Sequence, residues 1–237
     1  MGRTGIIGAM EEEIALLKEK MEIEVVVKKA SMEFYQGTMH GREVVVVRSG
    51  IGKVNAGLCA QILVDVFHAT RLINTGIAGS LKAEINIGDI VISSDALQHD
   101  MDATTFGYQR GEIPRMETLA FPADEELIAM AKAACEEACP EIDVFVGRVV
   151  TGDQFIAERS VKQEIAAWTE GYCTEMEGAA IAQAAYLNRV PFVIVRAISD
   201  KADDSAFVDY PTFEREAIEH SVKLVEAFAD RIPEDAF

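Results

Sequence analysis

Residues 174–203 most constrain what this chain can fold into, because they join an alanine-rich helix to an apolar strand that carries charges. Pro191 ends the connecting turn, and residues 192–195 are an uninterrupted apolar run, typical of a strand buried on both faces. A helix with such small side chains can lie close against a sheet. The stretch therefore predicts an α/β fold. The small helix residues are Ala179, Ala180, Ala182, Ala184 and Ala185.

Two charged residues, Arg196 and Asp200, follow the apolar run. Alternation along a strand predicts that Arg196, Ile198 and Asp200 share one face, and roughly 13 Å of strand would let the two charges serve opposite ends of one ligand. Alternatively, each is paired with a neighbour in a buried salt bridge, since buried charges are nearly always paired or functional. Ligands of open α/β sheets bind beyond the carboxyl ends of strands, which favours a functional Asp200.

Acidic residues stand at two predicted helix starts, Glu175 and Glu177 at one and residues 11–13 at the other. The helix macrodipole favours acids there without any function. Successive helical residues point about 100° apart, so at most one residue of the triple glutamate can face a pocket.

The first half of the chain is rich in predicted strands. Residues 4–10 form a strand that leads into the helix at the triple glutamate, and residues 24–30, 32–39 and 42–49 form an antiparallel meander because tight turns separate them. Residues 49–53 are a glycine loop that satisfies neither a phosphate-loop nor a dinucleotide pattern, so its glycines are interpreted as letting the backbone approach a ligand.

A helix over residues 54–67 and a strand over residues 71–74 follow this loop. The strand opens into a small-residue turn at 75–80, which either presents backbone N–H groups to a ligand or is an ordinary tight turn. Residues 97–122 lack periodicity, and a long loop of this kind is usually functional or an interface.

In the second half, strands are predicted at 88–96 and 143–150, an amphipathic helix at 124–138 and a terminal helix at 211–230, and Ser160 is predicted to cap a short helix. No repeat or linker interrupts the pattern, so residues 1–237 are predicted to form a single domain.

Composition excludes several classes of protein. A formal net charge of −18 argues against binding to nucleic acid or to anionic membranes, because phosphate contact needs clustered Lys and Arg. The four cysteines show neither CxxC pairs nor zinc-like spacing, and no apolar segment is long enough to be a signal peptide or to span a bilayer. We expect a cytoplasmic protein that needs neither a cofactor nor a metal.

Seven segments together resemble the 5′-methylthioadenosine/S-adenosylhomocysteine nucleosidases of the purine nucleoside phosphorylase-like superfamily. They cover nearly the whole chain in the family's order. The segments are GIIGAMEEE (5–13), SGIGKVNAG (49–57), NTGIAGS (74–80), GDIV with HDMDATTFGY (88–108), TGDQFI (151–156), EMEGAAIA (175–182) and VPFVIVRAISDKAD (190–203).

The resemblance implies a three-layer α/β/α fold with a central mixed, twisted sheet, and an enzyme that hydrolyses the glycosidic bond of 5′-methylthioadenosine or S-adenosylhomocysteine to release adenine. By position, Glu13 would activate water and Asp200 would protonate adenine N7. Glu177 would hold the ribose hydroxyls with the backbone of Met176, and Arg196 would orient the water and Glu13.

The resemblance also implies that Phe155 stacks on adenine and that the backbone of Ile156 reads its edge. Phe106 and Pro114 would close the 5′-substituent pocket of the neighbouring subunit in a homodimer. The remaining expected pocket residues are Met10, Ile51, Ile77, Ala78, Gly79, Glu175, Ser199 and Tyr210.

The proposed chemistry suits these residue types. Cleavage places positive charge on the sugar and negative charge on the departing base, so one carboxyl must supply a proton and the other must activate water. An apolar environment is expected to keep Asp200 protonated, while Glu13 at a helix start can stay ionised.

Three positions in two segments depart from the family pattern. The family's TGSAGG loop reads TGIAGS here, so Ile77 and Ser80 replace a serine and a glycine, and Tyr210 replaces a phenylalanine. The first change bears on a hydroxyl contact near the water and leaves the backbone contacts in place.

Two other functions compete. A nucleoside phosphorylase would need a cationic, amide-rich cradle for phosphate, whereas here the first loop delivers three glutamates. A non-catalytic nucleoside-binding protein could share the fold but would not need Glu13, Glu177 and Asp200 together. The sequence leaves open which of 5′-methylthioadenosine, S-adenosylhomocysteine, 5′-deoxyadenosine or aminodeoxyfutalosine is preferred.

Overall fold

The computed structural model describes residues 2–202 and 206–231. At 206–211 it describes the backbone alone. Its strands are β1 Arg3–Gly8, β2 Glu22–Lys29, β3 Met32–Met39, β4 Arg42–Arg48, β5 Ala69–Ser80, β6 Ile90–Gln98, β7 Phe121–Pro122, β8 Val144–Thr151, β9 Cys173–Glu175 and β10 Phe192–Asp200. Its helices are α1 Glu11–Glu19, α2 Lys53–Phe67, α3 Glu125–Ala138, α4 Arg159–Thr169, α5 Gly178–Asn188 and α6 Ala206–Arg231, with a 3₁₀ turn η1 at Thr104–Phe106.

In the described part of the chain all the strands belong to one mixed sheet, ordered β10-β6-β8-β9-β5-β1-β4-β3-β2 with β7 beside β6. β10 pairs parallel with β5 and antiparallel with β6, so β10, β6, β8, β9 and β5 form a closed circuit. β1 continues from β5, and β4, β3 and β2 form the antiparallel meander that the tight turns predict.

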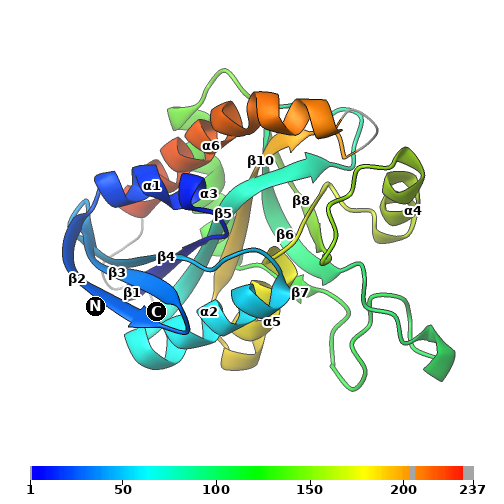
Figure 1. Ribbon diagram of the computed structural model, residues 1–237, viewed down its shortest axis with the longest axis horizontal. Coiled ribbons are helices and arrows are strands. Elements are labelled where there is room, and N and C mark those ends of the chain that lie inside the picture. Colours follow the sequence, from blue (N-terminus) through cyan, green and yellow to red (C-terminus); the bar gives the residue numbers. More distant parts are fainter. Residues whose placement is uncertain (1, 203–205, 232–237) are drawn as a thin grey trace.

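Helices cover both faces of this sheet (Figure 1). α1, α3 and α6 lie on one side, and α2 and α5 lie on the other. Each side has its own apolar core. The core under α2 and α5 is rich in alanine, as the sequence of α5 leads one to expect, and the core under α6 contains Phe228, Leu224 and Val225. The predicted three-layer α/β/α fold is confirmed.

β10 is buried at every residue, in agreement with its apolar sequence. The expected strict alternation along it is wrong at the carboxyl end. Ile198 pairs with Ala78 and Asp200 with the next residue, Gly79, so the register shifts at Ser199. A bulge of this kind places two residues of one strand opposite one of its neighbour. Ser199 and Asp200 can therefore both reach the same space at the end of the strand.

Three local predictions are also wrong. Residues 75–80 do not turn but extend β5 to Ser80, because they continue its pairing with β10 and then pair with β9. Glu158, not Ser160, is the N-cap of α4, and Ser160 is already inside the helix. α6 begins at Ala206 rather than near Pro211. None of the described helices is both long enough and apolar enough to cross a membrane.

Candidate active site

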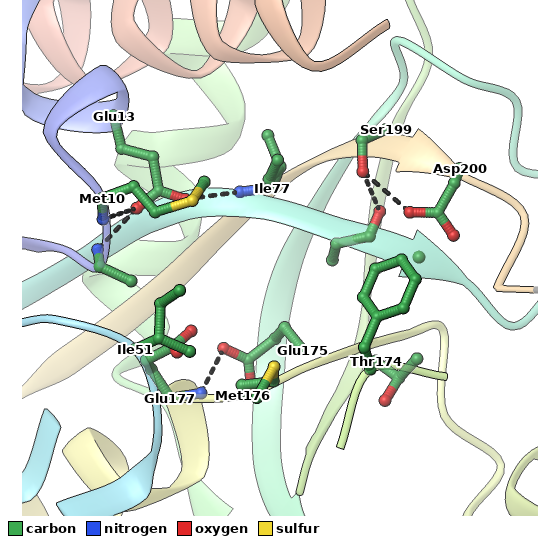
Figure 2. Close-up of a pocket in the computed structure, with 14 residues that line it drawn as sticks. Met10, Glu13, Ile51, Ile77, Thr174, Glu175, Met176, Glu177, Ser199 and Asp200 are labelled. Atoms are coloured by element: carbon green, nitrogen blue, oxygen red, sulfur yellow. Dashed lines mark hydrogen bonds between the residues drawn. The ribbon is translucent and has the colours of Figure 1, made fainter. Parts of the chain in front are cut away.

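A cavity of about 420 Å³ lies where β1, β5, β9 and β10 end and α1 and α5 begin (Figure 2). This is the edge of an α/β sheet at which ligands usually bind. Its wall is mostly apolar but includes four carboxylates. The lining residues are Ala9, Met10, Glu13, Ile51, Ile77, Ala78, Gly79, Phe155, Thr174, Glu175, Met176, Glu177, Ser199 and Asp200.

Glu13 is the only member of the triple glutamate that is buried, as the 100° spacing of helical residues predicts. Its Oε2 accepts hydrogen bonds from the amides of Ala9 at 2.6 Å and Met10 at 3.0 Å, and its Oε1 accepts one from Ile77 at 3.3 Å. Burial raises the pKa of Glu13, while Arg196 and these three amides oppose the rise. The expectation that a helix start keeps Glu13 ionised therefore omitted the larger effect on its pKa, which is the loss of solvent around the carboxyl.

Asp200 lies across the cavity from Glu13, at the end of β10 (Figure 2). It is only 2% exposed. Its Oδ1 accepts from the amide of Ala202 at 2.6 Å, and its Oδ2 accepts from Ser199 Oγ at 3.0 Å. The bulge at Ser199 thus supplies both the carboxyl and a hydroxyl that orients it.

Arg196 lies beneath the cavity instead of lining it. Its Nη2 donates to Glu175 and, at 2.6 Å, to Oδ1 of Asn74, and Glu177 Oε2 lies 3.8 Å away. Burial disfavours the charge of Arg196, but Glu175, Glu177 and Glu13 outweigh it and raise the pKa of the guanidinium. The buried ion pair that the sequence left open is therefore present for Arg196, and its role in orienting the water and Glu13 stays a prediction.

Glu175 ends the short strand β9, three residues before α5 begins at Gly178. Its Oε2 accepts from the amides of Glu177 at 3.1 Å and Gly178 at 2.7 Å, so it still satisfies the first N–H groups of α5. Thr151 Oγ1 donates to Glu175 and accepts from the amide of Ala179 at 2.7 Å. Glu175 is therefore held from several directions.

Glu177 is the N-cap residue of α5 and its side chain faces the cavity. Oε1 accepts from the amide of Gly52 at 2.8 Å. Burial and the nearby Glu175 raise the pKa of Glu177 to about 7, against the opposing effects of Arg196 and Gly52. This carboxyl can therefore change its protonation state near neutral pH.

Most of the residues expected from the sequence line this cavity, but four of those whose side chains are described do not. Arg196 and Ile156 are buried behind the wall. Phe106 is 83% exposed, Pro114 is also exposed, and neither lines the cavity of this chain. Tyr210 lies outside the residues whose side chains are described.

Sequence reasoning missed two polar residues of the floor, Asn74 and Thr151, as well as Thr174 and Ala9 in the wall. Asn74 follows an apolar strand run and Thr151 follows another, and a polar side chain in such a place is the signal that could have found them. Among the described residues no group of three His, Cys, Asp or Glu side chains is placed to hold a metal ion.

The fold and this cavity are those of the nucleoside phosphorylase class, and a sequence profile described as the phosphorylase superfamily matches residues 3–230. Two curated relatives are 5′-methylthioadenosine/S-adenosylhomocysteine nucleosidases. One, from Staphylococcus carnosus (strain TM300), is 43% identical over 93% of this chain and 96% of its own. The other, from Exiguobacterium sp., is 40% identical over 97% of this chain and 98% of its own.

Solved structures give the same result. The nucleosidase of Colwellia psychrerythraea 34H in complex with adenine superposes with a TM-score of 0.95 at 38% identity, covering 99% of this chain and 97% of that one. The nucleosidase of Neisseria meningitidis in complex with methylthio-immucillin-A has a TM-score of 0.94 at 37% identity, covering 98% and 100%. The chain belongs to the 5′-methylthioadenosine/S-adenosylhomocysteine nucleosidase family.

Proposed function

We propose that the protein hydrolyses the N-glycosidic bond of 5′-methylthioadenosine and S-adenosylhomocysteine and thereby releases adenine. Family membership supports the reaction class. The observation that carries the assignment of residues is that Glu13 and Asp200 line one cavity from different sides (Figure 2). A nucleoside bound between them would have its sugar near one carboxyl and its purine near the other.

Glu13 is the proposed base that activates water. A general base works best when its pKa approaches the working pH, and burial moves the pKa of Glu13 in that direction. Three backbone amides fix the carboxylate, so its orientation does not depend on flexible side chains. Arg196, which acts through its charge beneath the site, would favour the ionised form of Glu13.

Asp200 is the proposed acid that protonates N7 of the departing adenine. The leaving base gains negative charge as the bond breaks, so a proton delivered at that moment lowers the barrier. Ser199 and the Ala202 amide hold the two oxygens of Asp200. Phe155, 48% exposed at the cavity wall, is suited to stack on a purine, and the backbone of Ile156 follows it.

Glu177 and the backbone of Met176 are proposed to hold the ribose hydroxyls, since both residues line the cavity between the carboxyls. A carboxylate near the sugar would also stabilise the positive charge that develops there. Water is favoured over phosphate as the nucleophile, because Glu13, Glu175 and Glu177 make this part of the cavity acidic and would repel an anion.

We further propose that two copies associate and complete each other's pocket through Phe106 and Pro114. Large exposed apolar side chains support this. Phe106 is 83% exposed, Val54 75%, Ile51 55% and Leu58 51%, and the last three follow one another at helical spacing around the start of α2. Residues 1–237 would form one nucleosidase domain that acts in the cytoplasm.

The preferred 5′ substituent is a separate question. A structure of futalosine hydrolase from Helicobacter pylori is 30% identical and has a TM-score of 0.92, covering 98% of both chains. The same fold therefore serves nucleosides with different 5′ groups. Assays should compare 5′-methylthioadenosine, S-adenosylhomocysteine, 5′-deoxyadenosine and aminodeoxyfutalosine.

The test measures adenine release by chromatography with and without phosphate, together with the sugar product. We expect equal rates in both buffers and free 5′-methylthioribose as the product. Glu13→Gln and Asp200→Asn should each lower kcat by roughly 10²–10⁴-fold. Glu12→Gln is the matched control, since Glu12 is exposed on the same helix turn. Strict phosphate dependence would identify a phosphorylase, and turnover equal in wild type and Asp200→Asn would indicate a binding protein.

A further inference from the structure

Three loops beside the cavity are tied together by a closed ring of polar contacts between Lys53, Asp100 and Asp153. Lys53 Nζ donates to Asp100 Oδ1 at 2.6 Å. Asp100 Oδ2 accepts from the amide of Asp153 at 2.9 Å, and Asp153 Oδ1 accepts from the amide of Lys53 at 2.9 Å. The three residues come from the start of α2, the end of β6 and the end of β8, far apart in sequence.

The ring also completes the N-terminus of α2. The N-cap residue Gly52 has no side chain, and the first turn of α2 contains no acid of its own. Two carboxylates from elsewhere accept the first amides instead, Asp153 from Lys53 and Glu177 from Gly52. Helix N-termini favour such acceptors because their first N–H groups have no partner inside the helix.

The side chains of Lys53 and Asp100 are largely shielded, with 18% and 20% exposure. Burial alone would raise the pKa of Asp100, but the hydrogen bonds from Lys53 and from the Asp153 amide lower it, so the Asp100 carboxyl is ionised at neutral pH. Lys53 Nζ also donates to Gln98 Oε1 at 3.1 Å, and Gln98 Nε2 donates to Gln183 on α5 at 2.6 Å. The ring is therefore anchored to the body of the protein.

Two of the three loops in the ring carry a residue of the cavity wall; the loop after β6, which carries Asp100, does not. Ile51 precedes Lys53 by two residues, and Phe155 follows Asp153 by two residues. The amide of Gly52, which lies between Ile51 and Lys53, donates a hydrogen bond to the Glu177 carboxylate. A shift of the loop before α2 would thus move both Ile51 and the hydrogen-bond donor of Glu177.

We propose that Lys53, Asp100 and Asp153 are positioning residues that hold the Ile51–Gly52 and Phe155 loops, and with them Glu177, in the geometry that binds the nucleoside. This rests on the proposed function of the cavity. The ring touches no reacting atom, so its loss should weaken binding of substrate and transition state alike and raise KM more than it lowers kcat.

The experiment compares Asp153→Ala, Asp153→Asn and Asp100→Ala in steady-state assays with 5′-methylthioadenosine, with free adenine as a product inhibitor. Asp153→Ala frees the α2 loop but keeps the Asp153 amide on Asp100. This variant should raise KM about fivefold, which corresponds to the loss of one hydrogen bond. Its kcat should stay within about twofold of the wild-type value, and inhibition by adenine should change little. Asp153→Asn keeps an acceptor oxygen and should restore most of the KM. Asp100→Ala should weaken adenine as well, since it also releases the Phe155 loop.

Asp95→Asn is the control, because it breaks the ion pair of Asp95 with Arg148, of similar exposure but away from the cavity. It should change thermal stability without changing KM. Lys53→Met replaces Asp153→Ala if that variant is unfolded at the assay temperature. The inference is overturned if the ring variants leave KM as unchanged as Asp95→Asn does, or if Asp153→Asn is no better than Asp153→Ala. A wild-type protein that releases no adenine would instead overturn the proposed function.

Discussion

Arg196 and Glu175 form a buried ion pair under the cavity, with side chains that are 1% and 2% exposed. Asn74 accepts a further hydrogen bond from the same Nη2 at 2.6 Å. The guanidinium does not line the cavity. Its positive charge nevertheless acts on Glu13 and Glu177, whose carboxyls do line the cavity. One cation thus allows three carboxylates to occupy a small, water-poor region.

Arg196→Met should consequently destabilise the protein strongly. Removal of one member of a buried pair leaves the other as an uncompensated charge, and such a change typically costs about 3–5 kcal/mol. We expect a loss of this size in the free energy of unfolding at pH 7, measured by urea denaturation. Arg148→Met, which breaks the more exposed pair with Asp95, is the comparison and should cost less. Equal losses would mean that the Arg196 pair has no special role.

Gly76→Ala should impair catalysis by displacing Arg196 and Glu13. A Cβ at Gly76 would lie 2.1 Å from Arg196 Nη1 and 2.6 Å from Glu13 Oε1, so both groups would have to move. A displacement of about 1 Å in an active site can cost on the order of 10²-fold in rate, and we expect a fall of that order in kcat/KM.

Gly57→Ala provides the control for this substitution. A Cβ at Gly57 has nothing within 4 Å, and the residue lies inside α2. Alanine there should keep kcat/KM and stabilise the helix by up to about 1 kcal/mol. Normal activity of Gly76→Ala in the adenine-release assay would show that Glu13 and Arg196 tolerate displacement.

Local sequence patterns predicted the main elements because apolar spacing reflects burial directly. The meander, the apolar β10 and the single inward residue of the triple glutamate all depend on neighbours in the chain, and the structure shows each of them. The family's motifs likewise predicted most of the residues that meet in the cavity. Their roles in catalysis remain predictions.

The features that could not be predicted depend on contacts between distant segments. Glu175 and Arg196 are 21 residues apart, and only the sheet brings them together, so the sequence could not decide between a ligand site and an ion pair. The bulge at Ser199 arises from the register between β10 and β5. Burial of Glu13 likewise depends on β5, whose Ile77 amide reaches its carboxylate.

Glu177 should make stability depend on pH. Its pKa is raised in the folded protein from 4.5 to about 7, so the folded state binds the proton more tightly than the unfolded state does. Its contribution is fully present below pH 4.5 and is lost as the pH rises towards 7. Other acids titrate in the same range, so the informative quantity is the difference between wild type and Glu177→Gln.

That difference in unfolding free energy should move in favour of the variant by on the order of 3 kcal/mol between pH 4.5 and pH 7.5, because each pKa unit corresponds to about 1.4 kcal/mol. Urea denaturation at several pH values measures it. Glu43→Gln, a change at a carboxylate that is 41% exposed, serves as the control. A pH-independent difference for Glu177→Gln would place the pKa of Glu177 near its ordinary value.

Ile77→Ser should shift the pH dependence of the reaction. Ile77 lines the cavity and its amide bonds to Glu13, whose pKa is raised chiefly by burial (Figure 2). A serine would admit water and a hydroxyl beside the carboxylate and so favour its ionised form. As a base, Glu13 must be ionised, so kcat/KM falls as the pH drops through its pKa. The acidic limb of the kcat/KM profile should therefore move to lower pH in the variant.

Ala78→Ser adds a hydroxyl at the next residue, which makes no hydrogen bond to Glu13, and should leave that limb in place. If both variants keep the wild-type limb, the group that titrates in the assay is not Glu13.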